Sequence, residues 1–127
     1  MSGARWVRAD GKRPITISGR PASSTKPVTW SSLEAVRASS AGDGFGVMLG
    51  DGLGCYDLDH VTDEQVRAFV STLPEPVVLI ERSRSGTGAH VFVQAEETRG
   101  WRRTIDGMNV ERYTRHRFIR TTLERIR

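Results

Sequence analysis

The strongest constraint on the fold lies in residues 44–60, which read GFGVMLGDGLGCYDLDH. Asp51 and Gly52, in the middle of this run, form a dipeptide typical of a two-residue hairpin turn. Apolar residues lie on both sides of the turn, in runs of strand length. The run therefore predicts a strand over 45–49, a tight turn over 50–52 and a returning strand over 53–59.

The returning strand ends with two acids, Asp57 and Asp59, one residue apart. Because side chains alternate between the faces of a strand, both carboxylates lie on one face, opposite Tyr56 and Leu58. Neighbouring carboxylates repel each other, and their burial is costly unless a cation lies between them. The pair is therefore a candidate site for Mg²⁺ or Mn²⁺. An edge strand whose acids face water is the alternative.

The remaining elements are predicted from turn-forming residues and from the spacing of apolar residues. Residues 5–28 are rich in proline and glycine and should be mostly loop with short extended pieces. A short helix is predicted over 29–37, capped by Ser31 or Thr29, and an amphipathic helix runs from Thr62 until Pro74 ends it. Strands are predicted over 77–80, 89–93, 108–113 and 117–121, the last two as a hairpin. This mixture indicates an α+β fold with a largely antiparallel, mixed sheet and flanking helices.

The composition is that of an ordinary globular protein. The chain has 127 residues, 37% of them hydrophobic and 27% charged, and this length fits one domain over residues 1–127. No run approaches the ~20 apolar residues of a membrane span, and the first residues lack a signal-peptide core. The single cysteine, Cys55, excludes an intrachain disulfide and a cysteine-based zinc site. By elimination, we expect a cytoplasmic protein.

Positive charge gathers in the last third of the chain. The net charge is +4, and the residues from Arg99 onward include nine arginines but three acids. Guanidinium groups match the geometry of phosphates, so the charge favours a polyanionic partner. A basic surface without a specific partner is the alternative.

A loop of small residues, Ser85-Gly86-Thr87-Gly88-Ala89-His90, follows the strand over 77–80. Its backbone N–H groups and hydroxyls have the chemistry of an anion-binding nest, and His90 begins the next strand, within reach of a phosphate held there. The alternative is an ordinary hairpin loop with a histidine packed under it.

Two more residues complete a candidate constellation. Glu111 is an acid on the strand over 108–113, and Arg117 is a basic residue where the next strand begins. Each alone could be an exposed position on a half-solvated strand. Together with the paired acids and the loop, they supply three carboxylates for metal and several groups for phosphate. Metal-assisted nucleotidyl transfer needs these parts.

The order of these motifs resembles a known family. The chain has an acid pair on a strand, followed by Ser-Gly-Thr-Gly-x-His, the strand of Glu111 and the Arg-Phe-Ile of residues 117–119. This order is similar to that of the bifunctional DNA primase–polymerase (prim-pol) domain. That domain belongs to the archaeo-eukaryotic primase superfamily and is common in phages and mobile elements. The resemblance spans roughly residues 6–122 and implies a primase-like, RRM-like catalytic core.

The resemblance also implies roles for the residues. The metal ligands for Mg²⁺ or Mn²⁺, which are also catalytic, would be Asp57, Asp59 and Glu111. His90, a further catalytic residue, would contact the phosphates of an incoming NTP or dNTP, and the remaining nucleotide-binding residues would be Ser85, Thr87, Gly88 and Arg117. The implied activity is a nucleotidyltransferase that makes or extends primers on a single-stranded DNA template, in a bacterial host that carries a phage or element.

The chain departs from the family pattern in two ways. Arg84 stands where the family usually has proline, and the helical priming domain and helicase that often follow are absent from this sequence. The alternatives are therefore a minimal standalone catalytic domain, one part of a split primase, or a remnant, and the candidate partner is a helicase or other replication subunit. The main alternative is a non-catalytic primase-fold subunit that binds nucleic acid. A different metal enzyme, such as a nuclease, and a small α+β protein without a site stay open.

Overall fold

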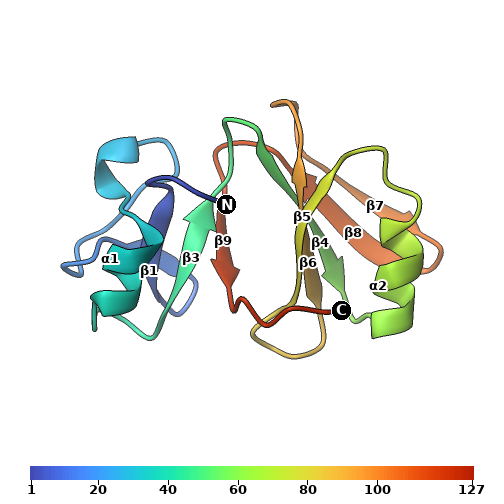
Figure 1. The fold of residues 1–127 in the computed structure, drawn as a ribbon, viewed down its shortest axis with the longest axis horizontal. Coiled ribbons are helices and arrows are strands. Elements are labelled where there is room, and N and C mark those ends of the chain that lie inside the picture. The colour runs from blue at the N-terminus through green and yellow to red at the C-terminus, as the bar shows by residue number, and fades with distance from the viewer. The chain divides into compact units, whose positions relative to one another are not determined.

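The computed structural model describes all 127 residues and confirms an α+β fold in which every strand pair is antiparallel (Figure 1). The chain forms two compact units. The first comprises residues 1–49 and 116–121, and the second comprises residues 50–115 and 122–127. The structure contains no helix that is long and apolar enough to cross a membrane.

The first unit is a four-stranded sheet with the order β2-β1-β3-β9. Its elements are β1 (Trp6–Asp10), β2 (Arg13–Ile15), the 3₁₀ helix η1 (Pro27–Thr29), α1 (Leu33–Ala38), β3 (Gly44–Met48) and β9 (Phe118–Thr121). Its core includes Trp6, Val36 and Val47, all buried. Gly46 has no room for a side chain, because an added Cβ would lie 2.4 Å from the carbonyl oxygen of Ile119.

The helix predicted over 29–37 begins later than expected. Ser31 pairs with Trp6 through two backbone hydrogen bonds, of 2.9 and 2.7 Å, and this pairing keeps residue 31 extended. The cap is therefore Ser32, whose hydroxyl accepts a hydrogen bond from the N–H of Ala35. The predicted caps, Ser31 and Thr29, were wrong.

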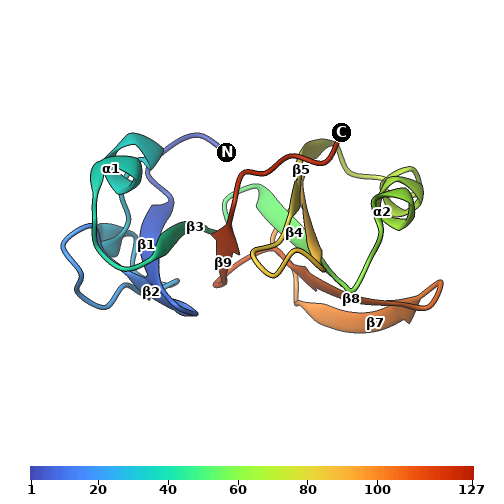
Figure 2. The same cartoon turned by 90° about the horizontal axis from the view of Figure 1, so that it is seen from below.

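The second unit is a five-stranded sheet with the order β5-β6-β4-β8-β7, and one helix packs on it (Figure 2). Its elements are β4 (Leu53–Asp59), α2 (Asp63–Val70), β5 (Val77–Arg82), β6 (Ala89–Gln94), β7 (Trp101–Ile105) and β8 (Met108–Tyr113). The central strand β4 lies between β6 and β8, so its side chains have neighbours on both sides.

One face of this sheet forms the core beneath α2. Val66 and Phe69 of the helix join Tyr56, Leu58 and Val91 of the sheet in one buried cluster. The helix begins where the sequence predicts, and Thr62 caps it in a reciprocal capping box with Gln65. The alternation of the strands leaves their other side chains on the opposite face, and the candidate site residues lie there.

Two predicted hairpins do not form as pairs. The turn at Asp51-Gly52 is present, with φ angles of 50° and 92°, but β3 pairs with β1 and β9 whereas β4 pairs with β6 and β8. Likewise, β8 pairs with β7 and β4, and β9 pairs with β3 in the other sheet. In both places the two strands joined by the turn pair with other strands and not with each other.

Three strands lie outside the predicted set. β1 and β2 occupy part of the segment expected to be mostly loop, and β7 forms a hairpin with β8. The turn of this hairpin is Asp106-Gly107, with φ angles of 49° and 78°. Because this dipeptide has the same turn chemistry as Asp51-Gly52, it was the signal that could have revealed β7.

Candidate active site

A row of polar side chains crosses the whole second sheet at one level. Neighbouring strands place its members directly opposite each other, and directly opposite residues share a face. From β5 to β7 the row consists of Glu81, His90, Asp57, Glu111 and Arg102. The site residues predicted on three separate strands are thus brought together by register.

The row exists because the strands alternate in sequence. Tyr56 and Leu58 on β4 point into the core under α2, so Asp57 points to the opposite face. The same holds for His90, whose neighbours Ala89 and Val91 belong to the core. A slip of one residue in any strand would exchange the two faces, so burial of the apolar set holds the polar row in place.

His90 links two carboxylates. Its Nδ1 lies 2.8 Å from Oε2 of Glu81, and its Nε2 lies 3.7 Å from Oδ1 of Asp57. The Glu81 side chain is fully buried, the His90 side chain is 10% exposed and that of Asp57 is 34% exposed. The row therefore becomes more open to solvent from β5 towards β4.

Asp57 and Glu111 are direct cross-strand neighbours, an arrangement in which like charges repel. Arg102 offsets part of this repulsion, because its Nε and Nη2 donate to Oε1 of Glu111 at 2.9 and 2.6 Å. The hydrogen bond from Arg102 to Glu111 and the charge of that carboxylate raise the pKa of the guanidinium above its ordinary value. Each acid at the centre of the row thus has a basic neighbour on its outer side.

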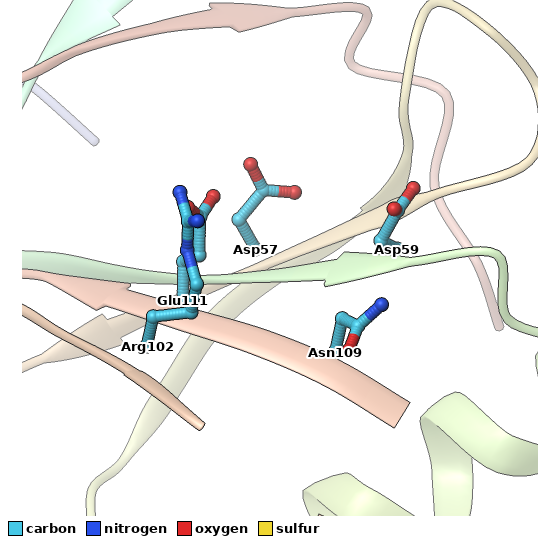
Figure 3. Close-up of a pocket in the computed structure, with 5 residues that line it drawn as sticks. All are labelled: Asp57, Asp59, Arg102, Asn109 and Glu111. Carbon is cyan, nitrogen blue, oxygen red and sulfur yellow. The ribbon is translucent and has the colours of Figure 1, made fainter. Parts of the chain in front are cut away.

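The open end of the row is a pocket of about 520 Å³ (Figure 3). It is lined by Asp57, Asp59, Arg102, Asn109 and Glu111. Asp59 is opposite Asn109 in the same register that places Asp57 opposite Glu111. Figure 3 shows Asp57 and Asp59 projecting from the same side of β4, as the spacing of the two acids predicts.

The donor chemistry of this pocket fits a hard divalent cation. Three carboxylates and one carboxamide supply oxygen atoms, the ligands that Mg²⁺ and Mn²⁺ prefer. As the side chains lie, however, no three His, Cys, Asp or Glu groups are close enough together to bind a metal ion. Glu111 is turned to Arg102, and Oδ1 of Asp59 lies 2.9 Å from Nδ1 of His60. Chelation therefore requires these acids to turn towards Asp57.

The small-residue loop is held by its own hydrogen bonds. The N–H groups of Gly86 and Gly88 donate to the carbonyl and hydroxyl oxygens of Ser83, and that of Thr87 donates to Oγ of Ser85. Gly88 is required here, since an added Cβ would lie 2.8 Å from the carbonyl oxygen of Leu58. The loop thus places His90 at the start of β6, while three of the expected nest donors are already engaged.

Arg117 is not part of the sheet that carries the other predicted site residues. It is exposed, precedes β9 and belongs to the first unit, where its carbonyl oxygen accepts from the N–H of Leu49. The basic residue that the second unit itself brings to the acids is Arg102.

Three residues of the site were not anticipated: Glu81, Arg102 and Asn109. Arg102 and Glu111 align through the Asp106-Gly107 hairpin, which the turn dipeptide could have revealed. Asn109 lies two residues before Glu111 and repeats the spacing of Asp59 and Asp57. Glu81 stands at the end of an otherwise apolar strand, and a buried acid in such a position usually has a specific partner.

A second polar cluster on the helix side of the sheet is structural. Arg112 donates to Tyr56 at 3.1 Å and to Glu75 at 2.8 Å, and the Tyr56 hydroxyl donates to Glu75 at 2.9 Å. Burial raises the pKa of Glu75, but hydrogen bonds from Arg112 and Tyr56 and the charge of Arg112 outweigh burial, so the pKa lies below its ordinary value. Burial is the main cause that raises the pKa of Tyr56.

A relative among known proteins points to the same family as the motifs. No protein-family model matches the chain, and no solved structure matches it. The chain is 34% identical over 107 aligned residues to the DNA Primase-polymerase of Nitratiruptor phage NrS-1. This match covers 73% of the chain, which spans 15% of the length of the phage protein. The chain is therefore related over most of its length to a phage DNA primase-polymerase, and the resemblance seen in its motifs is confirmed.

Proposed function

We propose that this chain is a metal-dependent nucleotidyltransferase of the DNA primase–polymerase type, which makes or extends primers on single-stranded DNA. The observation that carries the proposal is the cross-strand placement of Asp57 opposite Glu111, with Asp59 in the same pocket. The relation to a phage primase-polymerase supports it, as does the antiparallel sheet with one packed helix, which suits a primase-like, RRM-like core.

Asp57, Asp59 and Glu111 would hold Mg²⁺ or Mn²⁺. When bound, the divalent ions supply Lewis-acid activation of a primer 3′-hydroxyl and neutralise charge on the triphosphate. The chain's part is to bring three carboxylates to one pocket from two rigid strands. Because β4 is the central strand of the sheet, the sheet holds the backbone positions of both aspartates with little freedom.

The phosphates of an NTP or dNTP would bind beside the acids. His90 turns Nε2 towards Asp57, so the ring lies at the border between the acids and the small-residue loop. Arg102 reaches the same pocket from β7 and would bind phosphate once Glu111 no longer holds it. Ser85, Thr87 and Gly88 would contact the nucleotide on the loop side, and Arg117 would be a further nucleotide-binding residue.

The template would be single-stranded DNA, bound largely through its phosphates and bases without strong sequence preference. On β7, the guanidinium of Arg103 lies 4.2 Å from the ring centre of Trp101, on the face of the sheet opposite the pocket residue Arg102. A cation and an aromatic ring on an exposed strand suit stacking and phosphate contact. A helicase or other replication subunit is the expected partner, in the cytoplasm of a bacterium that carries a phage or element.

A primer-synthesis assay on single-stranded DNA tests the proposal, with labelled NTPs or dNTPs and Mg²⁺ or Mn²⁺. Asp57→Asn should abolish the labelled products, because it keeps the shape of the side chain but removes its charge. Asp10→Asn is the matched control, since Asp10 is exposed and pairs only with Arg13 at the surface. Products that persist in a folded Asp57→Asn variant would refute the metal assignment.

The second candidate is a non-catalytic subunit that binds nucleic acid with the same fold. The observation that favours it is the absence of a preassembled group of three metal ligands. It predicts DNA binding that persists in EDTA, no nucleotide incorporation and no change in melting temperature with Mg²⁺ or Mn²⁺. These outcomes separate it from the catalytic proposal.

A further inference from the structure

Glu81 is the most deeply buried charged residue of the row. It is 0% exposed, on the same face as His90, and none of the predicted site motifs includes it. Burying a carboxylate without partners is very costly, so its surroundings must compensate for the lost hydration. The structure shows three donors around it.

Three of the groups that face the Glu81 carboxylate can donate hydrogen bonds to it. The backbone N–H of Leu123 donates to Oε1 at 3.1 Å, and that of Thr122 donates to Oε2 at 3.3 Å. The third is Nδ1 of His90, 2.8 Å from Oε2. Because two backbone N–H groups already donate to this carboxylate, the ring suits it best as a third donor through Nδ1, which leaves Nε2 to face Asp57.

The two backbone donors are held in place by the C-terminal segment. This segment lies along β5, where Ile126 donates to Ile80 and the N–H of Arg82 donates to Glu124, each at 2.9 Å. Leu123 has a φ of +57°, a conformation that non-glycine residues adopt only where their surroundings require it. Here that conformation accompanies an N–H directed at the Glu81 carboxylate.

We propose that Glu81 is a positioning residue, which holds the His90 ring by Nδ1 so that Nε2 is presented to the phosphate of an incoming nucleotide. This inference rests on the proposed function, because it gives His90 a nucleotide to contact. It goes further by assigning a purpose to the buried carboxylate and to the C-terminal segment that surrounds it. Glutamine cannot replace Glu81 fully, since its amide nitrogen would face a donor on at least one side.

The first test reads the histidine ring directly and needs no variant. Nitrogen-15 NMR of the imidazole in the wild-type protein distinguishes a ring protonated at Nδ1 from one protonated only at Nε2. We expect a protonated Nδ1 at His90, with its proton protected from exchange with solvent. A ring protonated only at Nε2 would overturn the proposal, whatever the activity of the protein.

The second test measures binding of magnesium tripolyphosphate, a probe for the phosphate contact alone, by calorimetry. Glu81→Gln and His90→Ala should each weaken binding about tenfold, the size of effect seen when a partner that orients a histidine is removed. The double variant should be no weaker than His90→Ala alone, because Glu81 acts through the ring. The melting temperature of each variant shows whether it is folded.

The outcomes separate this inference from the proposed function. If the wild-type protein does not bind the probe, the phosphate site fails, and Glu81 is left with a structural role only. If it binds and a folded Glu81→Gln variant binds equally well, or if the two substitutions add, the positioning role is refuted while the proposed function stands. Should Glu81→Gln not fold, the ring spectrum of the wild-type protein decides.

Discussion

Asp57→Asn should separate stability from function. In the metal-free protein, Asp57 lies directly opposite Glu111, and like charges in such a cross-strand pair cost roughly 0.2–1 kcal/mol. Removing one charge relieves this repulsion and places an amide, in place of the carboxylate, beside Nε2 of His90, which is 3.7 Å away. We therefore expect a melting temperature equal to that of the wild type or slightly higher, together with a complete loss of nucleotide incorporation.

Added Mg²⁺ should make the wild type more stable than Asp57→Asn. At about 10 mM Mg²⁺, a site with a Kd of about 1 mM would stabilise the wild-type protein by about 1.4 kcal/mol. For a unit of this size, each kcal/mol raises the melting temperature by roughly 4–8 °C. The wild type should therefore gain about 6–11 °C with Mg²⁺, and Asp57→Asn should gain almost none.

Thermal melting followed by circular dichroism, with and without Mg²⁺, measures both effects. Asp10→Asn controls for the removal of a surface carboxylate and should respond to Mg²⁺ as the wild type does. An equal gain with Mg²⁺ in Asp57→Asn and in the wild type would place the cation elsewhere. A strongly destabilised Asp57→Asn without metal would show that the favourable contacts of the Asp57 carboxylate outweigh its repulsion from Glu111.

Two further predictions concern the neighbours of the site. Arg102→Gln should tighten Mn²⁺ binding a few-fold in calorimetry, because Glu111 then no longer has to leave an arginine; unchanged or weaker binding would contradict this competition. Glu75→Gln should destabilise the protein at pH 7 by about 1.5–3 kcal/mol, as expected for a half-buried hydrogen bond to a charged group. The folded pKa of Glu75 is lowered, so its contribution is complete above the unfolded pKa of about 4.3 and is lost as the pH falls through the folded value. Urea unfolding of both proteins from pH 7 to pH 2 should therefore converge at low pH, and a constant difference would contradict the role of Arg112.

Sequence reasoning succeeded where the physics is local. The start of the helix at Thr62 and the turn at Asp51-Gly52 depend on residues a few positions apart, and both are present. The placement of Asp57 and Asp59 on one face follows from the two-residue period of a strand. The order of the motifs was enough to recognise a relative of a phage primase-polymerase.

The pairing of the strands could not be predicted from residues that are close together in the sequence. A tight turn brings two strand ends together, but the free energy of pairing comes from burying side chains against whichever partner covers them best. At Asp51-Gly52 those partners belong to two different sheets, so the turn joins strands that do not pair. At Asp106-Gly107 the same chemistry joins two strands that do.

The chain by itself therefore determined which residue types are available for chemistry: three carboxylates, a histidine, a small-residue loop and many arginines. Only the tertiary structure decided that Asp57, Glu111 and His90 share one row, that Arg102 rather than Arg117 joins the acids in the second unit, and that Glu81 is buried behind the histidine. The physical reason is that register between distant strands is set by packing of the opposite, apolar face, and no local sequence pattern contains that information.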